Sequence, residues 1–374
     1  MTVEVRDISS RRDLKTFIYL PEKIHRGHTN WVPPLYADEW RYFDRAKNKA
    51  FAYCPTVLLL AWRDGRPVGR VMGIINPKFN EFRGVRLARF GNLETYEDPE
   101  TVHALLTRVE EWARGQGMTR IIGPYGFSDQ DPEGFLIEGF ENRATIATYY
   151  NFEWVPCLVE SEGYVKDIDY FVYKVEVPNV VPEFYQKIYE RGVKRGGFHV
   201  VEFRRRKDLN PWVRPLLDLM NECYTSGNIY GFAPLDEKEM ENLARRYLPI
   251  LDPRFIKIVE QNGEIMAFIV GMPDITEGIQ KARGRLFPFG FIWILRAAKK
   301  TRQLDLLLGA VKEKHRGHGL DVLMGTRMLM TAREAGMEFM DSHHEMESNV
   351  RVRAIMERMG GRIYKRFRVY QKAL

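Results

Sequence analysis

The chain has 374 residues, of which 45% are hydrophobic and 13% aromatic, and this composition predicts buried globular cores and excludes disorder. Its three cysteines are widely spaced, so we expect no disulfide, no zinc site and a reducing, cytoplasmic location. The charged N-terminus predicts no signal peptide, and no apolar run approaches the ~18 residues that a membrane span requires. The net charge of +7 fits either an anionic ligand or simply a basic protein.

The first predicted elements are a short strand at residues 3–6, an amphipathic helix and a hairpin. Apolar runs at 57–62 and 68–75 flank a turn that contains Asp64 and Gly65. Asp-Gly between apolar runs is a strong hairpin signal because both residues tolerate positive φ. The first half therefore begins as a β-α-β-β unit.

An acidic insertion follows at residues 123–145. Long loops in compact domains are often functional. We hypothesise that this one overhangs a cleft in the second half and supplies anionic groups for a cationic amine. The alternative is a solvated surface excursion. Its acidic residues are Asp129, Asp131, Glu133, Glu138 and Glu141.

The second half of the chain repeats the first. Residues 3–6 recur at 201–204, and the Asp-Gly turn recurs as Asn262-Gly263, both 198 positions later. Such self-similarity predicts one structural unit used twice, with an insertion at a different place in each copy. The halves meet at residues 175–182, a segment with two prolines and no periodic pattern. We place the boundary there, which gives domains of residues 1–177 and 178–374.

The remaining elements of the second half alternate strands with helices. The helix expected at 320–335 buries an apolar stripe, and Gly336 fits its C-terminal stop. The order β-α-β-β-β-loop-α-β-α-β predicts an α/β fold with a mixed sheet. The expected elements are a strand at 201–204, a helix at 211–223, strands at 255–260, 265–270 and 304–311, a helix at 320–335, a strand at 337–342, a helix at 349–359 and a strand at 363–370.

A basic, glycine-rich loop joins the strand that ends at Val311 to the helix that begins at Leu320. Gly317 and Gly319 let backbone N–H groups approach an anion, and a helix start offers unpaired donors with a partial positive charge. The loop therefore predicts a diphosphate site, with a ligand-free turn as the alternative. The matching loop of the first half, residues 96–101, is acidic. The cations of the basic loop are Lys312, Lys314 and Arg316.

This loop resembles the coenzyme A loop of the GNAT family of acyl-CoA-dependent N-acyltransferases, whose signature is Arg/Gln-x-x-Gly-x-Gly/Ala. Arg316 and Gly319 match its first two fixed positions. The resemblance implies an α/β fold of two tandem GNAT-like domains, each a mixed, mostly antiparallel sheet flanked by helices, with a degenerate first copy. It also implies transfer of an acyl group, acetyl in the simplest case, from acyl-CoA as co-substrate to an amine of a small molecule or peptide. The residues it implies for cofactor binding are Val311, Lys312, Arg316, Gly317, His318, Gly319, Leu320 and Asn349.

Two positions depart from the family pattern. Asp321 stands where the signature has Gly or Ala. In a first helical turn it favours the helix dipole, but it repels a phosphate by about 1 kcal/mol. Met356 stands where many members have a tyrosine that protonates the leaving thiolate, and methionine cannot donate a proton. Another group or water must then serve, or the domain transfers nothing.

A polar, titratable run at residues 341–349 follows the strand expected beside the cofactor arm. A histidine, or a carboxylate with a raised pKa, can take a proton from an attacking amine near neutral pH. The candidate catalytic residues are therefore His343, His344 and Glu345, of which only some can face one cleft because side chains alternate along a strand. The alternative is a solvated strand end, with Asn349 capping the next helix. We expect no metal, since no further ligands stand at a supporting spacing.

The second insertion, at about 275–304, combines an apolar stretch at 287–295 with flanking cations. Three interpretations fit this composition: a core helix packed between the two halves, an element at a membrane surface, or the lining of a channel for an acyl chain. We expect the core helix.

Two other functions fit the same sequence. A non-catalytic acyl-CoA-binding protein follows if Met356 removes catalysis, and the tandem, basic architecture also resembles the Fem-type aminoacyl transferases. The intact loop argues against the second, because those ligases do not rely on a coenzyme A loop. Nucleic acid is not an expected partner, since the basic clusters lack interleaved aromatics. The acyl chain length, the acceptor and the oligomeric state stay open.

Overall fold

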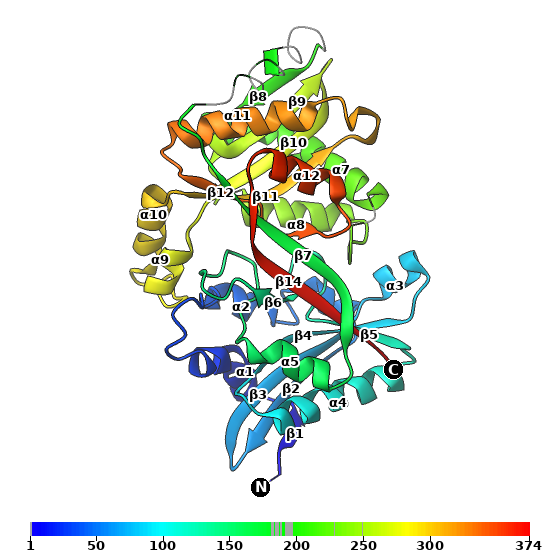
Figure 1. Cartoon of the computed structure of the whole chain (residues 1–374). Helices are drawn as coiled ribbons and strands as arrows, with labels where there is room; N and C mark the ends of the chain where they lie inside the picture. Colours follow the sequence, from blue (N-terminus) through cyan, green and yellow to red (C-terminus); the bar gives the residue numbers. More distant parts are fainter. Residues whose placement is uncertain are drawn as a thin grey trace.

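The computed structural model describes residues 2–374 except 181–182, 184–186, 188, 191–196, 228 and 249. Val181 and Pro182, which belong to the expected boundary segment, therefore lie outside the described residues. Each half of the chain contributes one lobe, and two long strands run between the lobes (Figure 1). The lobes share one 14-stranded sheet.

The first lobe is a sheet with helices packed on it. Its strands are β1 (Glu4–Asp7), β2 (Thr56–Arg63), β3 (Arg66–Ile75), β4 (Leu87–Thr95) and β5 (Arg120–Gly123). Its helices are α1 (Arg11–Ile24), α2 (Tyr36–Tyr42), α3 (Pro77–Arg83), α4 (Pro99–Gly115) and α5 (Trp154–Ser161). The strands pair in chain order, antiparallel except for the parallel pair of β4 and β5. The expected hairpin is β2–β3, and Asp64 at its turn has φ of 52°.

The second lobe has the same strand order. Its strands are β8 (His199–Glu202), β9 (Ile256–Gln261), β10 (Glu264–Pro273), β11 (Gln303–Val311) and β12 (Phe339–Asp341). Its helices are α7 (Asn210–Ser226), α8 (Glu237–Tyr247), α9 (Thr276–Lys281), α10 (Gly290–Lys300), α11 (Leu320–Glu334) and α12 (Val350–Arg358). Again the pairing is antiparallel except for one parallel pair, β11 with β12. The strand and helix order predicted from the sequence is confirmed in this lobe.

The two lobes exchange their last strands. β7 (Val165–Glu176) closes the first half of the chain but pairs with β12 of the second lobe. β14 (Arg362–Ala373) closes the second half but pairs with β5 of the first lobe. β7 and β14 also pair with each other at the centre of the sheet. A boundary between 177 and 178 along the chain stays a prediction, but in space each half completes the sheet of the other.

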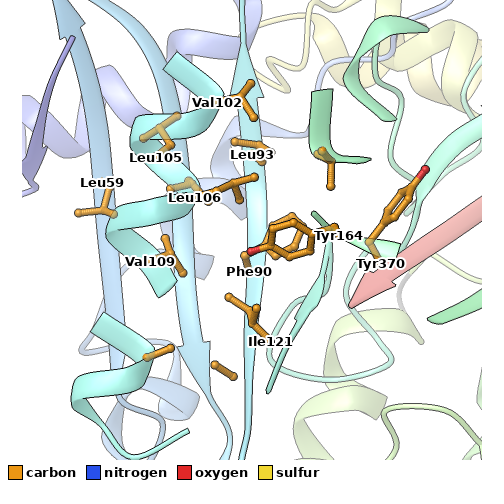
Figure 2. Close-up of a cluster of buried hydrophobic side chains, with 14 of the residues drawn as sticks. Leu59, Phe90, Leu93, Val102, Leu105, Leu106, Val109, Ile121, Tyr164 and Tyr370 are labelled. Atoms are coloured by element: carbon orange, nitrogen blue, oxygen red, sulfur yellow. The ribbon is translucent and has the colours of Figure 1, made fainter. Parts of the chain in front are cut away.

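The hydrophobic core of the first lobe shows this exchange directly (Figure 2). Leu105, Leu106 and Val109 of α4 pack on Phe90 and other residues of the sheet. Tyr370 of β14, which is fully buried, contributes to the same core. Since removing a buried aromatic ring costs about 3–5 kcal/mol of folding free energy, a residue of the second half stabilises the first lobe.

The second insertion does not form a core helix, so that expectation is wrong. It folds into α9 and α10, which stand at the side of the molecule between the lobes (Figure 1). Phe287 and Phe289, in the turn between them, are 81% and 68% exposed. The apolar stretch therefore faces outwards, which periodicity alone could not show because a buried and an exposed amphipathic helix share the same pattern.

Candidate functional site

The sheet of the second lobe opens between β11 and β12. Their parallel pairing covers only Gln303–Asp305 against Phe339–Asp341. β11 then continues along β10, whereas the chain after β12 follows β7 through the short strand β13 (Glu345–Met346). A register shift in the pairing of β10 with β11 leaves Leu307 as an extra residue, and such a bulge re-aims the neighbouring backbone. The result is a gap in the sheet that begins just beyond Asp305.

The glycine loop lies at the far end of β11, where α11 begins. Gly317 and Gly319 both have φ of +83°, which favours glycine, and a Cβ built at Gly317 meets nothing within 4 Å. Gly319 is the N-cap of α11, and no side chain among the residues that the structure describes caps the first turn. The helix therefore presents uncapped N–H donors with a partial positive charge.

The cations of this loop are held beside the helix start. Arg316 donates from Nε to the carbonyl oxygen of Val311 over 3.2 Å. Lys312 makes an ion pair of 2.6 Å with Glu264. His318 is exposed, and Leu320 is buried under the first turn of α11. The loop residues predicted from the sequence are thus brought together around an open helix N-terminus, and their binding of a cofactor stays a prediction.

The equivalent helix of the first lobe, α4, starts differently. Asp98 is its N-cap residue and Pro99 follows as the first helical residue. Arg63 donates to the carboxylates of Asp98 over 2.7 Å and of Glu100 over 2.8 Å, and the Thr101 hydroxyl also donates to Asp98. This helix start carries its own negative charges, so it is unsuited to a second anion.

The three candidate catalytic residues do not share one environment. His343 has φ of 58°, and its Nε2 lies 2.9 Å from the carbonyl oxygen of Ile146, the residue that follows the first insertion. His344 packs against the ring of Tyr170, with centroids 5.3 Å apart, and burial lowers the pKa of this imidazole well below its usual range. It is therefore neutral at physiological pH and a weak base.

Glu345 differs from both histidines. It lies on β13, where it is half-buried, and burial raises the pKa of its carboxyl to about 8. Tyr224 of α7 lies within electrostatic reach of both Glu345 and Asp129, and its hydroxyl faces the N–H of Gly309 on β11. Burial, reinforced by those two carboxylates, raises the pKa of Tyr224. Two acidic groups, one from each half of the chain, thus converge beside the gap in the sheet.

The first insertion contacts the second half, whereas its position over a cleft and its supply of anionic groups for an amine stay predictions. Thr145 donates to Asp341 over 3.1 Å, and Lys365 donates to the carbonyl oxygen of Arg143 over 2.6 Å. Asp341 is fully buried at the root of the gap, where Tyr364 also donates to it. These bonds fix the insertion against the end of β12.

The five acidic residues of that insertion have different contacts, and one of them, Glu141, accepts from the side chain of its neighbour Asn142 over 2.8 Å. Burial raises the pKa of Asp129 to about 7, and burial together with the charge of Asp129 raises the pKa of Glu133 to about 8. One carboxylate oxygen of each lacks a hydrogen-bond partner among the described residues. Asp131 instead accepts from the backbone N–H of Phe127, and Glu138 pairs with Arg366 on the outer side of β14. Asp129 and Glu133 are therefore the two that lie in the interior.

Three further residues, of which only Asn349 was an expected cofactor contact, make structural contacts. Asn349 accepts from the Val352 N–H at 3.5 Å as the N-cap of α12, so it caps this helix, and its contact with a cofactor stays a prediction. Met356 packs against the core of the second lobe. Tyr370 donates to Glu160 over 2.9 Å within the first lobe, away from the gap. Tyr224 was not predicted from the sequence, because on α7 it forms part of an ordinary amphipathic pattern.

Comparison with known proteins shows which fold this is. No family model matches the chain. A tandem GNAT protein from the clavulanic acid biosynthesis pathway superposes with a TM-score of 0.56 and 12% identity, over 99% of this chain and 98% of that one. A GCN5-related N-acetyltransferase from Sphaerobacter thermophilus gives 0.54 and 11%, over 99% and 95%. The chain has the tandem GNAT fold.

Two curated proteins resemble this tandem GNAT chain along its whole length. A bacterial ceramide synthase of Caulobacter vibrioides is 29% identical over 383 aligned residues, covering 100% of this chain and 98% of the relative. Protein YghO of Escherichia coli is 25% identical over 381, covering 99% and 95%. The uncapped start of α11, the glycines that leave room for close backbone approach, and Arg316 beside them fit the diphosphate of a coenzyme A thioester.

Proposed function

We propose that this protein is an acyl-CoA-dependent N-acyltransferase whose second lobe binds the acyl donor. The observation that carries the proposal is the uncapped glycine start of α11 at the end of a strand that separates from its neighbour. The donor's diphosphate would lie on the N–H groups of residues 317–321, and its thioester would reach the gap between β11 and β13. The amine acceptor would enter from the side of the first insertion.

The acyl donor is proposed to carry a fatty chain rather than acetyl. A ceramide is the amide of a fatty acid and a long-chain amino alcohol, and a relative named as a ceramide synthase aligns with the whole chain. An apolar cavity of about 70 Å³ lies beneath α7 and α8 and is lined in part by Leu308, next to the bulge of β11. Small movements of these helices would extend this cavity into a groove for a chain.

Glu345 is proposed as the base. The bound ammonium first releases one proton to solvent; the free amine nitrogen then attacks the thioester carbonyl, forms the C–N bond and passes a second proton to the carboxylate of Glu345. The C–S bond then breaks, and the same carboxyl returns the proton to the departing thiolate. A carboxyl pKa of about 8 lies close to that of an ordinary thiol, about 8.5, so both transfers are nearly balanced. This shuttle replaces the tyrosine that Met356 removes.

Asp129 and Glu133 are proposed to attract the acceptor. A long-chain base carries an ammonium group, and these interior carboxyls lie on the insertion whose Thr145 donates to Asp341 at the root of the gap. Their raised pKa values mean that a bound cation would favour their ionised forms, so binding and ionisation reinforce each other.

Calorimetry and product analysis test the proposal. The purified chain is titrated with CoA, acetyl-CoA and palmitoyl-CoA, and each thioester is then incubated with a long-chain amino alcohol while CoA release and amide are followed by mass spectrometry. We expect binding of all three and amide only from palmitoyl-CoA. Absence of binding at millimolar ligand rejects the proposal, and amide from acetyl-CoA alone rejects the fatty donor.

A non-catalytic acyl-CoA-binding protein is the second candidate. The observation in its favour is that Met356 packs into the core of the second lobe, so the usual proton donor is lacking. It predicts thioester binding in the same titrations without CoA release for any amine. The two candidates therefore separate on one measurement.

A further inference from the structure

The hairpin of α9 and α10 exposes an apolar face. Phe287 and Phe289 precede α10, and Leu295 within it is 59% exposed. Phe291 and Ile292 lie on the same side of α10 as Leu295, because residues three and four apart share one side of a helix. Contiguous exposed apolar surface of this kind marks an interaction site rather than a chance surface residue.

Cations border this face. Lys299 follows Leu295 by four residues and Arg296 follows Ile292 by four, so both lie beside the apolar side chains. Lys300 and Arg283 are exposed as well. Basic residues next to aromatic and aliphatic ones on one helix face are typical of segments that lie in the interface of an anionic membrane.

The hairpin is held firmly in this orientation. Gly278 of α9 packs directly on the backbone of α10, since a Cβ there would lie 2.6 Å from the Cα of Ile294. Gln280 donates to the carbonyl oxygens of Thr29 and Trp31 in the first lobe, over 2.9 and 2.7 Å. Arg285 makes an ion pair of 2.8 Å with Glu22 of α1. The apolar side chains are therefore displayed by a platform that belongs to the second half of the chain and is bonded to the first lobe.

We propose that the α9–α10 face docks on the surface of a bilayer that contains anionic lipids. Phe287, Phe289 and Leu295 would enter the boundary between headgroups and acyl chains, while Lys299 and Lys300 would meet lipid phosphates. The docking is peripheral, since no helix among the described residues is long and apolar enough to cross a membrane. It would present the gap of the second lobe to lipid substrates, although it does not depend on the proposed activity.

Vesicle sedimentation tests the docking without an activity readout. The full chain is mixed with vesicles of phosphatidylcholine alone, or of phosphatidylcholine that contains about 30 mol % phosphatidylglycerol. Each mixture is measured at low and at high salt. We expect salt-sensitive binding to the anionic vesicles only. The triple variant Phe287→Ser, Phe289→Ser, Leu295→Ser should bind the anionic vesicles about 100-fold more weakly or worse, because it has lost apolar surface that the membrane would bury. Lys299→Gln with Lys300→Gln should weaken it by about 25-fold.

A control variant separates the patch from general surface hydrophobicity. Phe82→Ser with Ile250→Ser removes exposed apolar side chains elsewhere, and it should leave vesicle binding within about two-fold of the parent. A second copy of this chain could cover the same face instead of a membrane. Light scattering of the parent and the triple serine variant measures the oligomeric state and tests this alternative. Equal vesicle binding by parent and triple variant overturns the proposal, as does a dimer that the triple variant converts to monomer without any change in vesicle binding.

Discussion

The starts of α4 and α11 occupy matching places in the two lobes. They differ in the residues that surround their first backbone N–H groups. At α4, Asp98 and Glu100 lie at the helix start and Arg63 bridges them. At α11, two glycines leave the N–H groups uncapped. The start of α4 is therefore satisfied by its own residues, whereas the start of α11 is left open, as the proposed diphosphate site requires.

Of the changes considered, removing the proposed base should have the largest effect, and the quantity that changes is turnover. Glu345→Gln keeps the shape of the side chain but cannot take a proton, so we expect turnover to fall by about 10²- to 10⁴-fold with CoA affinity unchanged within two-fold. In the parent, kcat/KM should rise with pH and level off above about 8, because only the ionised carboxylate is a base. The variant should lose that rise.

A neighbouring carboxylate provides the control for this experiment. Glu347, two residues on, pairs with Lys166 over 2.6 Å and accepts from the backbone of Asp169. Glu347→Gln should keep at least about a third of the parent's turnover and its pH profile, since its pairing is exposed and structural. An equal loss in both variants would show that the segment acts as a structural unit and that Glu345 is not the base.

Breaking the strand exchange should give the next largest effect. Tyr370→Ala removes a fully buried ring from the core of the first lobe and should lower the free energy of unfolding by about 3–5 kcal/mol. Tyr173→Ala does the same in the core of the second lobe. Hydrogen exchange should rise first in β4 and β5 for the former and in β11 and β12 for the latter. Faster hydrogen exchange in the other lobe first, for either variant, would contradict the strand exchange.

Charging the glycine loop should weaken cofactor binding more moderately. Gly317→Asp adds a carboxylate to the uncapped helix start and should weaken CoA binding by about 10- to 100-fold, through repulsion of the diphosphate. Gly117→Asp is the matched control: φ is +76° against +83°, and a Cβ meets nothing within 4 Å at either position. Both variants carry the same backbone strain, so only the first should lose affinity. Equal CoA affinities of the two variants would mean that the diphosphate binds elsewhere.

Much of the difference between the two lobes could be predicted from the sequence, because the patterns that indicate it are local. The two hairpin turns, the glycine loop and the acidic loop of the first half depend on residues close in the chain, and the structure has them where expected. The exchange of β7 and β14 was not accessible, since either partner strand offers the same alternating pattern. The pKa of Glu345 also depends on burial by distant elements, which one run of residues cannot reveal.

The smallest expected effect concerns the interior carboxyl of Glu133, where the two halves of the chain meet. Its pKa is raised by burial to about 8, so the folded protein retains a proton that the unfolded chain releases above about 4.5. Stability should therefore fall as pH rises from about 4.5 to 8, because the unfolded state binds fewer protons across that window. Glu133→Gln mimics the protonated form and should flatten this fall, by about 1–2 kcal/mol at pH 8. Urea unfolding at pH 5 and pH 8 measures it, and an unchanged slope between the two pH values would mean that Glu133 is already ionised within the fold.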